Sequence, residues 1–317
     1  ERTTFPELTD SPAARRRLGF LMSSGSFLPG KEGGEGWMRI EWYARARQGI
    51  KNYKRAGLVY GQAPDSFRLT FLTGGEERYS ELLPPSRSPG RVSFTVREPL
   101  NTQVEFHINS GVSPEVYAFF LEGDEGVVVH NIPVRGSAGL EFSRVNTGIL
   151  KGSLQEMRTG LVILQYGINL VPGWKGQTGW YLGRLTSELR FLRSLFPGVP
   201  VLVIGVSDML SPGTGGPEPY PGITDIRAAQ KEAALSAGCM FWDACEAMGG
   251  EGSVDEWVKN LPPLARTDYT HFTYAGSQLF AGLLYKAFEK EYLRYREYSG
   301  AAGMAGEKND TTGYIQG

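Results

Sequence analysis

The segment Asp268-Tyr269-Thr270-His271 contains two side chains that could carry out acid–base chemistry. A histidine can take the proton of a nucleophile and return it to a leaving alcohol. A carboxylate three residues earlier, on the same turn, can hold the imidazole in one tautomer and stabilise its charged form. The other two histidines, His107 and His130, lie within or at the end of apolar strand-like runs, which favours structural roles for them. Asp268 and His271 are therefore the leading catalytic candidates.

The chain after residue 124 has the pattern of a parallel sheet alternating with helices. Leucines at helical spacing predict a helix from 182 to 196, and a second helix is predicted from about 276 to 292. Four solid apolar runs predict buried strands at 127–133, 161–167, 201–207 and 239–244. This alternation predicts an α/β domain with a three-layer, doubly wound parallel sheet, whose sites lie at the carboxyl ends of its strands.

Two further residues follow predicted strands and should meet the Asp268–His271 pair at one edge of the sheet. They are Gly136, after 127–133, and Asn169, after 161–167. Each has a structural alternative. Gly136 can serve a tight bend, Asn169 can bind the backbone of its own turn, and Asp268 or Thr270 can cap the following helix.

Before residue 124 the chain alternates strictly between apolar and polar residues, as in Phe67, Leu69 and Phe71. This period of two predicts antiparallel strands with one buried face, and hence a β-sandwich or jelly-roll insert domain. The predicted organisation is a possible first strand and loop of the α/β domain at 1–34, a β-rich domain at 35–122, the α/β domain at 123–298 and a Gly-rich flexible tail at 299–317.

Composition excludes several classes of protein. The 317 residues carry a formal net charge of −1 with the basic residues scattered, so no nucleic-acid partner is expected. No apolar run approaches the roughly 20 residues that would span a bilayer. Cys239 and Cys245 are expected to be buried free thiols, and neither they nor the histidines have the spacing of metal ligands. Neither a metal nor a cofactor is expected.

The blocks NIPVRGSAG, VILQYGIN, GVSDM, FWDACEAMGG and DYTHFTYAG resemble the SGNH or GDSL hydrolase superfamily, over roughly residues 124–295. They are most similar to two-domain esterases that act on O-acetylated cell-surface glycans such as peptidoglycan. The resemblance implies that the Gly136 amide and the Asn169 side chain stabilise an oxyanion, with Asp268 and His271 as the acid–base pair. It also implies a carbohydrate-binding-like role for 35–122, an acylated polysaccharide substrate, and a periplasmic, cell-surface or secreted location.

The nucleophile departs from this pattern, because the sequence contains no Gly-Asp-Ser. Ser26, after the apolar run 18–22, is the candidate within the chain. Ser66 begins an alternating strand and Ser137 stands beside the glycine block, so both are poorer candidates. The serine can also lie upstream of this chain or be lost. Two hypotheses follow: an active acyl esterase, or a catalytically inactive glycan-binding or assembly subunit.

Three residues are candidates for substrate binding. Trp174 and Tyr220 lie in loops that could form the walls of a cleft, and aromatic rings suit the faces of sugars. Asp208 follows the predicted strand 201–207 and could line the same cleft. All three have alternatives, since the aromatic residues can pack within surface loops and Asp208 can serve a turn or a helix cap.

Overall fold

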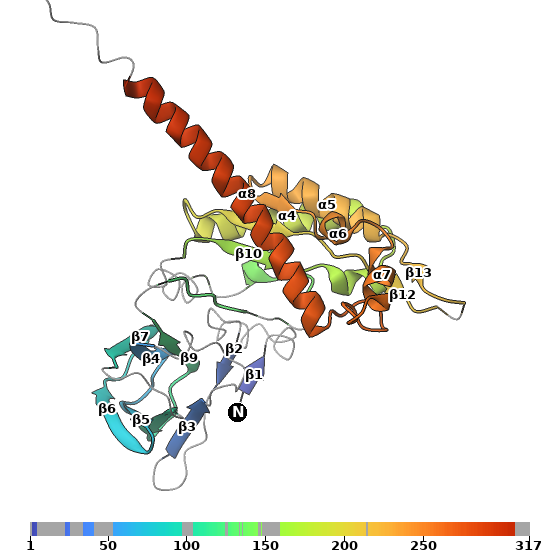
Figure 1. Ribbon diagram of the computed structural model, residues 1–317. Helices are drawn as coiled ribbons and strands as arrows, with labels where there is room; N and C mark the ends of the chain where they lie inside the picture. Colours follow the sequence, from blue (N-terminus) through green and yellow to red (C-terminus); the bar gives the residue numbers. More distant parts are fainter. Residues whose placement is uncertain are drawn as a thin grey trace, which may run out of the picture. The chain divides into compact units, whose positions relative to one another are not determined.

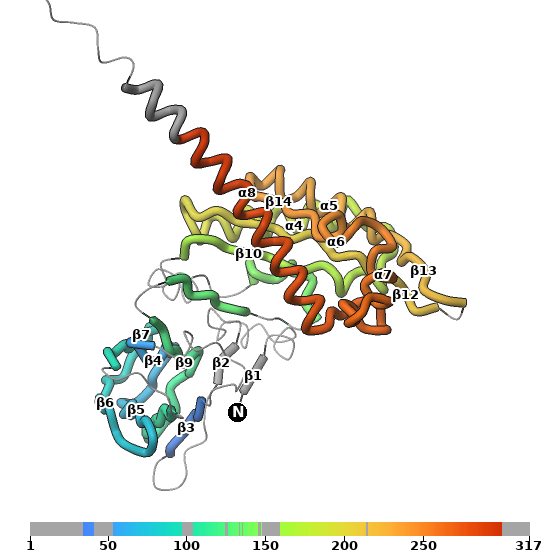
Figure 2. The backbone as a smooth tube through the Cα atoms, in the orientation of Figure 1, coloured from blue at the N-terminus to red at the C-terminus, as the bar shows by residue number. Residues whose placement is uncertain are grey.

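The computed structural model describes residues 2–4, 23–25, 34–40, 53–96, 104–123, 126–132, 134, 136–144, 147, 159–213 and 215–307 (Figures 1 and 2). The chain forms two compact units. The first unit contains Glu1–Leu164, Gly183–Leu202 and Ser236–Cys239. The second unit contains Gln165–Leu182, Val203–Leu235 and Met240–Gly317.

Two antiparallel sheets dominate the amino-terminal half of the chain. A five-stranded sheet has the order β1-β2-β9-β4-β7, and a four-stranded sheet has the order β3-β8-β5-β6. The strands are β1 (Arg2–Thr4), β2 (Ser23–Gly25), β3 (Gly34–Ile40), β4 (Arg55–Tyr60), β5 (Phe67–Thr73), β6 (Glu76–Leu83), β7 (Gly90–Thr95), β8 (Val104–Ser110) and β9 (Val116–Glu122).

Side chains from both sheets form one hydrophobic core. In β5, Phe67, Leu69 and Phe71 are fully buried, and Phe106 of β8 and Leu58 of β4 join them. The intervening residues of β5 and β8 point away from this core, as the period of two requires. The buried alternating face predicted from the sequence is therefore confirmed. That this part is an insert within the α/β domain stays a prediction.

The carboxyl-terminal half has the predicted α/β character. Its main sheet is parallel and has the order β10-β11-β14, and a separate two-stranded ladder joins β12 to β13. The strands are β10 (Val162–Gln165), β11 (Val201–Ile204), β12 (Leu210–Ser211), β13 (Glu218–Pro219) and β14 (Met240–Trp242). The helices are η2 (Phe142–Arg144), η3 (Ile168–Gly173), α4 (Thr178–Leu195), α5 (Ile223–Ser236), α6 (Ala244–Met248), α7 (Ser253–Lys259) and α8 (Tyr274–Glu307). The arrangement of these elements in three layers stays a prediction.

One predicted strand is wrong. Residues 126–132 form no strand, and the side chains of Val127 and Val129 are 90% and 83% exposed. A run of valines favours an extended backbone, but a strand also needs a neighbouring edge to pair with. Among the described residues, β10 rather than 127–133 forms the edge of the parallel sheet beside β11.

Two short strands within the predicted segment 1–34 lie in the five-stranded antiparallel sheet, and the assignment of the rest of 1–34 stays a prediction. Strand β2, which contains Ser24 and Gly25, pairs antiparallel with β1 and with β9 of the five-stranded sheet. The short strand β2 therefore belongs to the antiparallel sheet and is not the first strand of the parallel sheet. The apolar run 18–22 and Ser26 lie outside the described residues.

Helix α8, in red in Figure 2, extends beyond its predicted end at residue 292. It continues to Glu307 and so includes the first part of the predicted tail 299–317. Within the described part of the chain, no helix is both long and apolar enough to cross a membrane.

A buried glutamine joins the elements of the second unit. Gln230 of α5 is 2% exposed, and its Oε1 accepts the backbone N–H of Val206, just after β11, at 2.8 Å. Its Nε2 donates to the carbonyl of Tyr166, just after β10, at 2.8 Å and to the Tyr181 hydroxyl of α4 at 3.2 Å. One carboxamide therefore fixes the carboxyl ends of two adjacent strands and a helix.

We predict that Gln230→Leu lowers the free energy of unfolding by about 2–4 kcal/mol, because two buried polar groups and the partly buried carbonyl of Tyr166 lose this partner. Denaturant unfolding followed by circular dichroism would measure the loss. The control is Gln278→Leu on the exposed surface of α8, which should change stability by less than about 0.5 kcal/mol. Equal effects at the two positions would contradict the role assigned to Gln230.

Candidate active site

The Asp268–His271 pair has the geometry of a catalytic acid–base pair. His271 Nδ1 lies 2.9 Å from Asp268 Oδ2. Asp268 Oδ1 accepts the backbone N–H groups of Thr270 at 3.0 Å and of His271 at 2.9 Å. The His271 side chain is 72% exposed. A carboxylate at Nδ1 favours the tautomer that carries its proton there, which leaves Nε2 as the nitrogen that can act as a base.

The loop that presents this pair is closed by backbone hydrogen bonds. Arg266 donates its N–H to the carbonyl of His271 at 2.8 Å, and Tyr269 donates to the carbonyl of Arg266 at 2.9 Å. Tyr269 has a φ of 54°, a left-handed conformation that is uncommon for a residue other than glycine. Its carbonyl accepts the N–H of Leu210, in β12, at 3.3 Å. The loop is thereby attached to the chain that leaves the carboxyl end of β11.

Aromatic packing anchors the residue that follows His271. The Phe272 ring lies 5.2 Å from the Trp257 ring of α7 and 5.1 Å from the Phe280 ring of α8, measured between centroids. The Thr273 hydroxyl accepts the N–H of Gly276 at 3.1 Å and so caps the start of α8. Asp268 and Thr270 do not cap α8, because the Asp268 carboxylate is used within its own loop.

Hydrogen bonds within the loop also lower the pKa of the Asp268 carboxyl group. Partial burial raises the pKa of Asp268, but the hydrogen bonds outweigh this effect and hold the pKa below its ordinary value. They come from the backbone N–H of His271, the His271 ring and the backbone N–H of Thr270. Asp268 is therefore ionised at neutral pH, as a residue that stabilises an imidazolium must be.

Asn169 lies on the segment that follows β10. Gly167 precedes it with a φ of 105°, and a Cβ built there would lie 2.4 Å from Gln230 Nε2. Glycine is therefore needed at 167, both for the backbone turn and for the packing of Gln230. Asn169 itself is exposed, near the start of η3. Because β10 and β11 are parallel neighbours, Asn169 and the Asp268–His271 loop both belong to the carboxyl edge of this sheet.

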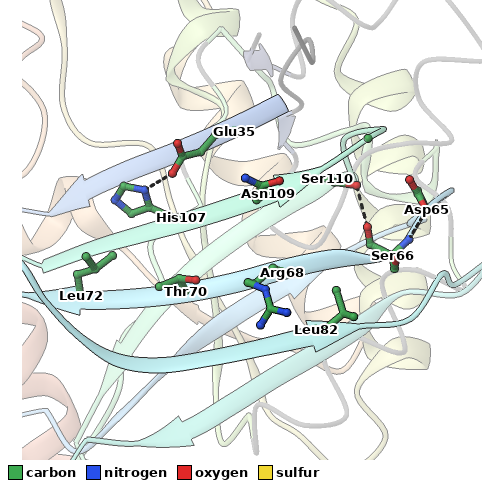
Figure 3. A pocket seen from close by; sticks show the side chains of 11 residues that line it. Glu35, Asp65, Ser66, Arg68, Thr70, Leu72, Leu82, His107, Asn109 and Ser110 are labelled. Carbon is green, nitrogen blue, oxygen red and sulfur yellow. Dashed lines mark hydrogen bonds and ion pairs between the residues drawn. The ribbon is translucent and has the colours of Figure 1, made fainter. Parts of the chain in front are cut away.

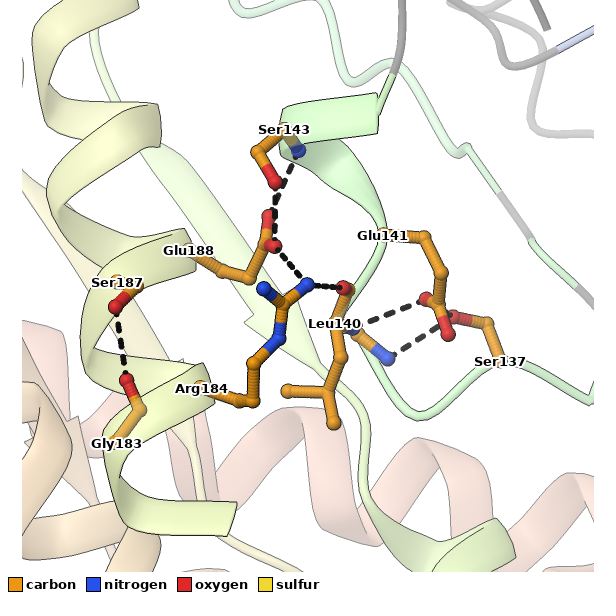
Figure 4. A network of polar contacts seen from close by, with 9 residues as sticks. Ser137, Leu140, Glu141, Ser143, Gly183, Arg184, Ser187 and Glu188 are labelled. Atoms are coloured by element: carbon orange, nitrogen blue, oxygen red, sulfur yellow. Dashed lines mark hydrogen bonds and ion pairs between the residues drawn. The ribbon is translucent and has the colours of Figure 1, made fainter. Parts of the chain in front are cut away.

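The residues that follow Gly136 are fixed by a polar network on α4 (Figure 4). The buried Glu188 accepts the backbone N–H and the hydroxyl of Ser143 at 2.7 and 2.6 Å. Arg184 donates to Glu188 at 3.0 Å and to the carbonyl of Leu140 at 3.0 Å.

Ser137 has a structural role beside this network. Its hydroxyl donates to Glu141 at 2.6 Å and accepts the N–H of Gly139 at 2.9 Å. Gly136 has a φ of 75°, as expected for a tight bend. Because Gly136 belongs to the first unit and Asn169 and His271 to the second, their approach to one another stays a prediction.

Two of the candidate substrate-binding segments come together. The Trp174 ring packs against Gly222, where a Cβ would lie 1.9 Å from the indole, and its centroid lies 5.9 Å from that of Tyr181. The indole N–H is buried and has no hydrogen-bond partner among the described residues. Tyr220, two residues before Gly222, is partly exposed. The loops of Trp174 and Tyr220 therefore adjoin, and their role as cleft walls stays a prediction.

Asp208 is better explained by its structural alternative than by substrate binding. Its side chain is buried, and Oδ2 accepts the N–H of Val254 in the first turn of α7 at 2.8 Å. This bond satisfies one of the free amide groups at the start of that helix.

The two cysteines are buried free thiols, as predicted, and burial raises the pKa of Cys245 to about 11.

The residues that sequence reasoning missed are Gln230, which binds the ends of β10 and β11, and Glu188, which binds the segment after Gly136. Gln230 interrupts the buried face of α5 formed by Ile226, Ala229 and Ala233. Glu188 lies beside the buried Leu185 and Leu189 of α4. A single polar residue in an apolar helical face is the signal that could have identified both, because burial of such a group requires hydrogen-bond partners.

We predict that the stabilisation provided by the Asp268 carboxylate depends on pH. Its pKa is lower in the folded than in the unfolded chain, so the stabilisation is present above the unfolded pKa and is lost as pH falls through the folded pKa. The difference in melting temperature between wild type and Asp268→Asn should therefore be larger at about pH 7 than at about pH 2. His271→Ala retains the backbone donors and should lose only part of this dependence. A difference that is the same at both pH values would contradict the assignment.

Comparison with known proteins supports the fold at this point. No protein-family model matches the chain, and no curated protein matches it in sequence. A solved structure of a peptidoglycan O-acetylesterase superposes with a TM-score of 0.64 at 17% identity, covering 86% of this chain and 72% of that one.

Two more distant structures are also similar. A putative GDSL-like lipase from Parabacteroides merdae gives a TM-score of 0.32 at 19% identity, covering 43% of this chain and 67% of its own. A family two carbohydrate esterase from Clostridium thermocellum, in complex with cellohexaose, gives 0.31 at 10% identity, covering 87% and 98%. The fold assignment rests on the peptidoglycan O-acetylesterase structure. The chain thus shares its fold with the peptidoglycan O-acetylesterase structure, in agreement with the resemblance found in the sequence.

Proposed function

We propose that this chain is a serine esterase of the SGNH type that removes acyl groups, principally acetyl, from a cell-surface glycan. The observation that carries the proposal is the 2.9 Å contact between His271 Nδ1 and an ionised Asp268, on a loop at the carboxyl edge of the parallel sheet. The fold similarity to a peptidoglycan O-acetylesterase supports an acetyl ester on a glycan as the substrate. A periplasmic or cell-surface location is part of this proposal.

In the proposed reaction, a serine Oγ attacks the ester carbonyl carbon while His271 Nε2 takes its proton. The carbonyl oxygen becomes an oxyanion, which the Gly136 N–H and the Asn169 side-chain amide stabilise. Collapse of this intermediate breaks the bond to the sugar oxygen, which leaves with the proton from His271. Water then releases acetate from the acyl-enzyme by the same steps. Asp268 stabilises the imidazolium throughout.

Ser26 is the proposed nucleophile within this chain, although the strand that precedes it belongs to the antiparallel sheet. The competing hypothesis is a catalytically inactive glycan-binding or assembly subunit, and the absence of Gly-Asp-Ser favours it. The two hypotheses make opposite predictions about ester hydrolysis.

We expect the purified chain to hydrolyse an aryl acetate. His271→Ala and Ser26→Ala should each lower kcat about 10³-fold or more, because each removes a residue of one catalytic unit. His130→Ala is the matched control and should retain full activity, since this histidine lies outside the proposed site. If all four proteins show only the background rate, the esterase hypothesis fails and the inactive subunit is favoured. A fluorophosphonate label on a serine other than Ser26 would retain the activity and refute Ser26 as the nucleophile.

The contribution of Asn169 can be tested separately. Removing an oxyanion donor lowers kcat about 10²- to 10³-fold with little change in KM, because the donor acts mainly in the transition state. Asn169→Ala should show this pattern in aryl acetate hydrolysis. The exposed Asn131→Ala is the control and should have the wild-type kcat. A change in KM alone would show that Asn169 binds the substrate but does not stabilise the oxyanion.

A further inference from the structure

The outer face of the four-stranded sheet carries an ordered array of polar side chains. Strands β3, β8 and β5 pair in register, so their outward residues form three rows across the sheet. The rows are Glu35–Asn109–Arg68, Trp37–His107–Thr70 and Arg39–Glu105–Leu72. Rows of this kind place neighbouring side chains about 5 Å apart across the strands. The face therefore presents a regular grid of donors and acceptors.

This face is hollowed. A groove of about 590 Å³ lies over the array, and Figure 3 shows Glu35, His107, Asn109, Thr70 and Arg68 pointing into it. Leu72 and Leu82 add apolar surface to its lining. The groove is formed entirely by residues of the first unit, and the candidate active site does not use any of them.

On one side of this face, Glu35, His107, Glu105 and Arg39 are linked by hydrogen bonds and ion pairs. His107 Nδ1 lies 2.5 Å from Glu35 Oε1, and His107 Nε2 lies 2.9 Å from Glu105 Oε2. Arg39 continues the chain with a 3.0 Å contact to Glu105. Burial lowers the pKa of His107, but its hydrogen bonds with the two glutamates outweigh this effect and raise the pKa overall. These four side chains satisfy one another and form a fixed wall.

The other side has unused hydrogen-bonding capacity. The Asn109 amide is exposed and makes no hydrogen bond with the described residues. Arg68 has a long contact of 3.4 Å to the Ser80 hydroxyl, which leaves most of its guanidinium donors available. A groove that combines a fixed wall with available donors and acceptors is suited to a ligand with many directional polar groups.

Trp37 extends the same face with an exposed aromatic ring. It is 61% exposed, and its partner across the ladder is His107. The guanidinium carbon of Arg39 lies 5.4 Å from the ring centroid, which restricts the ring. A large exposed aromatic side chain costs hydrophobic free energy unless a ligand covers it. The charges of this face and its groove balance, with Glu35, Glu105 and Asp65 against Arg39, Arg68 and His107, so the face has no strong field that would select a polyanion.

From this arrangement we propose that the outer face of β3, β8 and β5 is a second ligand site, which binds an uncharged saccharide chain. The Trp37 ring covers the apolar face of a sugar, and Asn109 and Arg68 bind its hydroxyl or amide groups. This inference extends the proposed function, because the site would hold the same glycan whose acyl groups the esterase removes. It does not require the chain to be catalytic.

Calorimetric titration of the whole chain with tetra-N-acetylchitotetraose, a neutral oligosaccharide without ester groups, tests the site. Wild type should bind it, and Trp37→Ala and Asn109→Ala should each weaken binding by about tenfold or more. Trp180→Ala is the matched control, because that tryptophan is 59% exposed on α4, outside the groove, and binding should be unchanged. Equal melting temperatures of the variants would show that folding is intact.

Several outcomes would overturn the inference. They are no binding by wild type, equal binding by wild type and Trp37→Ala, and binding of polygalacturonate in place of the neutral oligosaccharide. Aryl acetate hydrolysis measured on the same samples separates this inference from the proposed function. Binding without hydrolysis refutes the esterase alone, and hydrolysis without binding refutes the saccharide site alone.

Discussion

The second unit depends on the burial of one carboxamide. Gln230 forms hydrogen bonds with backbone groups at the ends of β10 and β11, and it does so from a helix between β11 and β14 in the sequence. An unpaired buried amide or carbonyl would cost about 1–3 kcal/mol, so this arrangement strongly favours one position of the two strand ends. The segment that contains Asn169 begins directly after Tyr166, whose carbonyl accepts a hydrogen bond from Gln230. The position of this segment is therefore set by the same hydrogen bond.

The Asp268–His271 loop is supported by a different kind of interaction. Aromatic packing of Phe272 against α7 and α8 fixes the end of the loop, whereas hydrogen bonds fix its interior. The left-handed Tyr269 lies between the two candidate residues. Strained backbone persists where the surroundings over-determine it, and such residues cluster at functional sites. The loop keeps Asp268 and His271 in contact and leaves the His271 imidazole exposed, where a substrate could reach it.

Sequence reasoning succeeded where the signal is local. The alternation of Phe67, Leu69 and Phe71 reports a buried strand face because successive side chains point to opposite sides of a strand. The Asp268–His271 contact follows from two residues on one turn. It failed at Val127–Val129, because the partner of a strand is chosen by distant parts of the chain. The roles of Gln230 and Glu188 were missed for the same reason, since the partners of Gln230 lie 24 to 64 residues away and Ser143, bound by Glu188, lies 45 residues away. Asn169 and Gly136 were located by the predicted strands that precede them, and their proposed oxyanion roles came from family resemblance.

The hydrogen bond between Val206 and Gln230 has a consequence for the dynamics of the molecule. The Val206 N–H is buried beside β11 and bound to a side chain that is itself fully enclosed. Its proton can exchange with solvent only when the core of the second unit opens. The N–H of Thr270, in contrast, is bound to a carboxylate that is half exposed, so local opening of the loop suffices. Hydrogen exchange therefore separates motion of the candidate catalytic loop from opening of the framework that supports it.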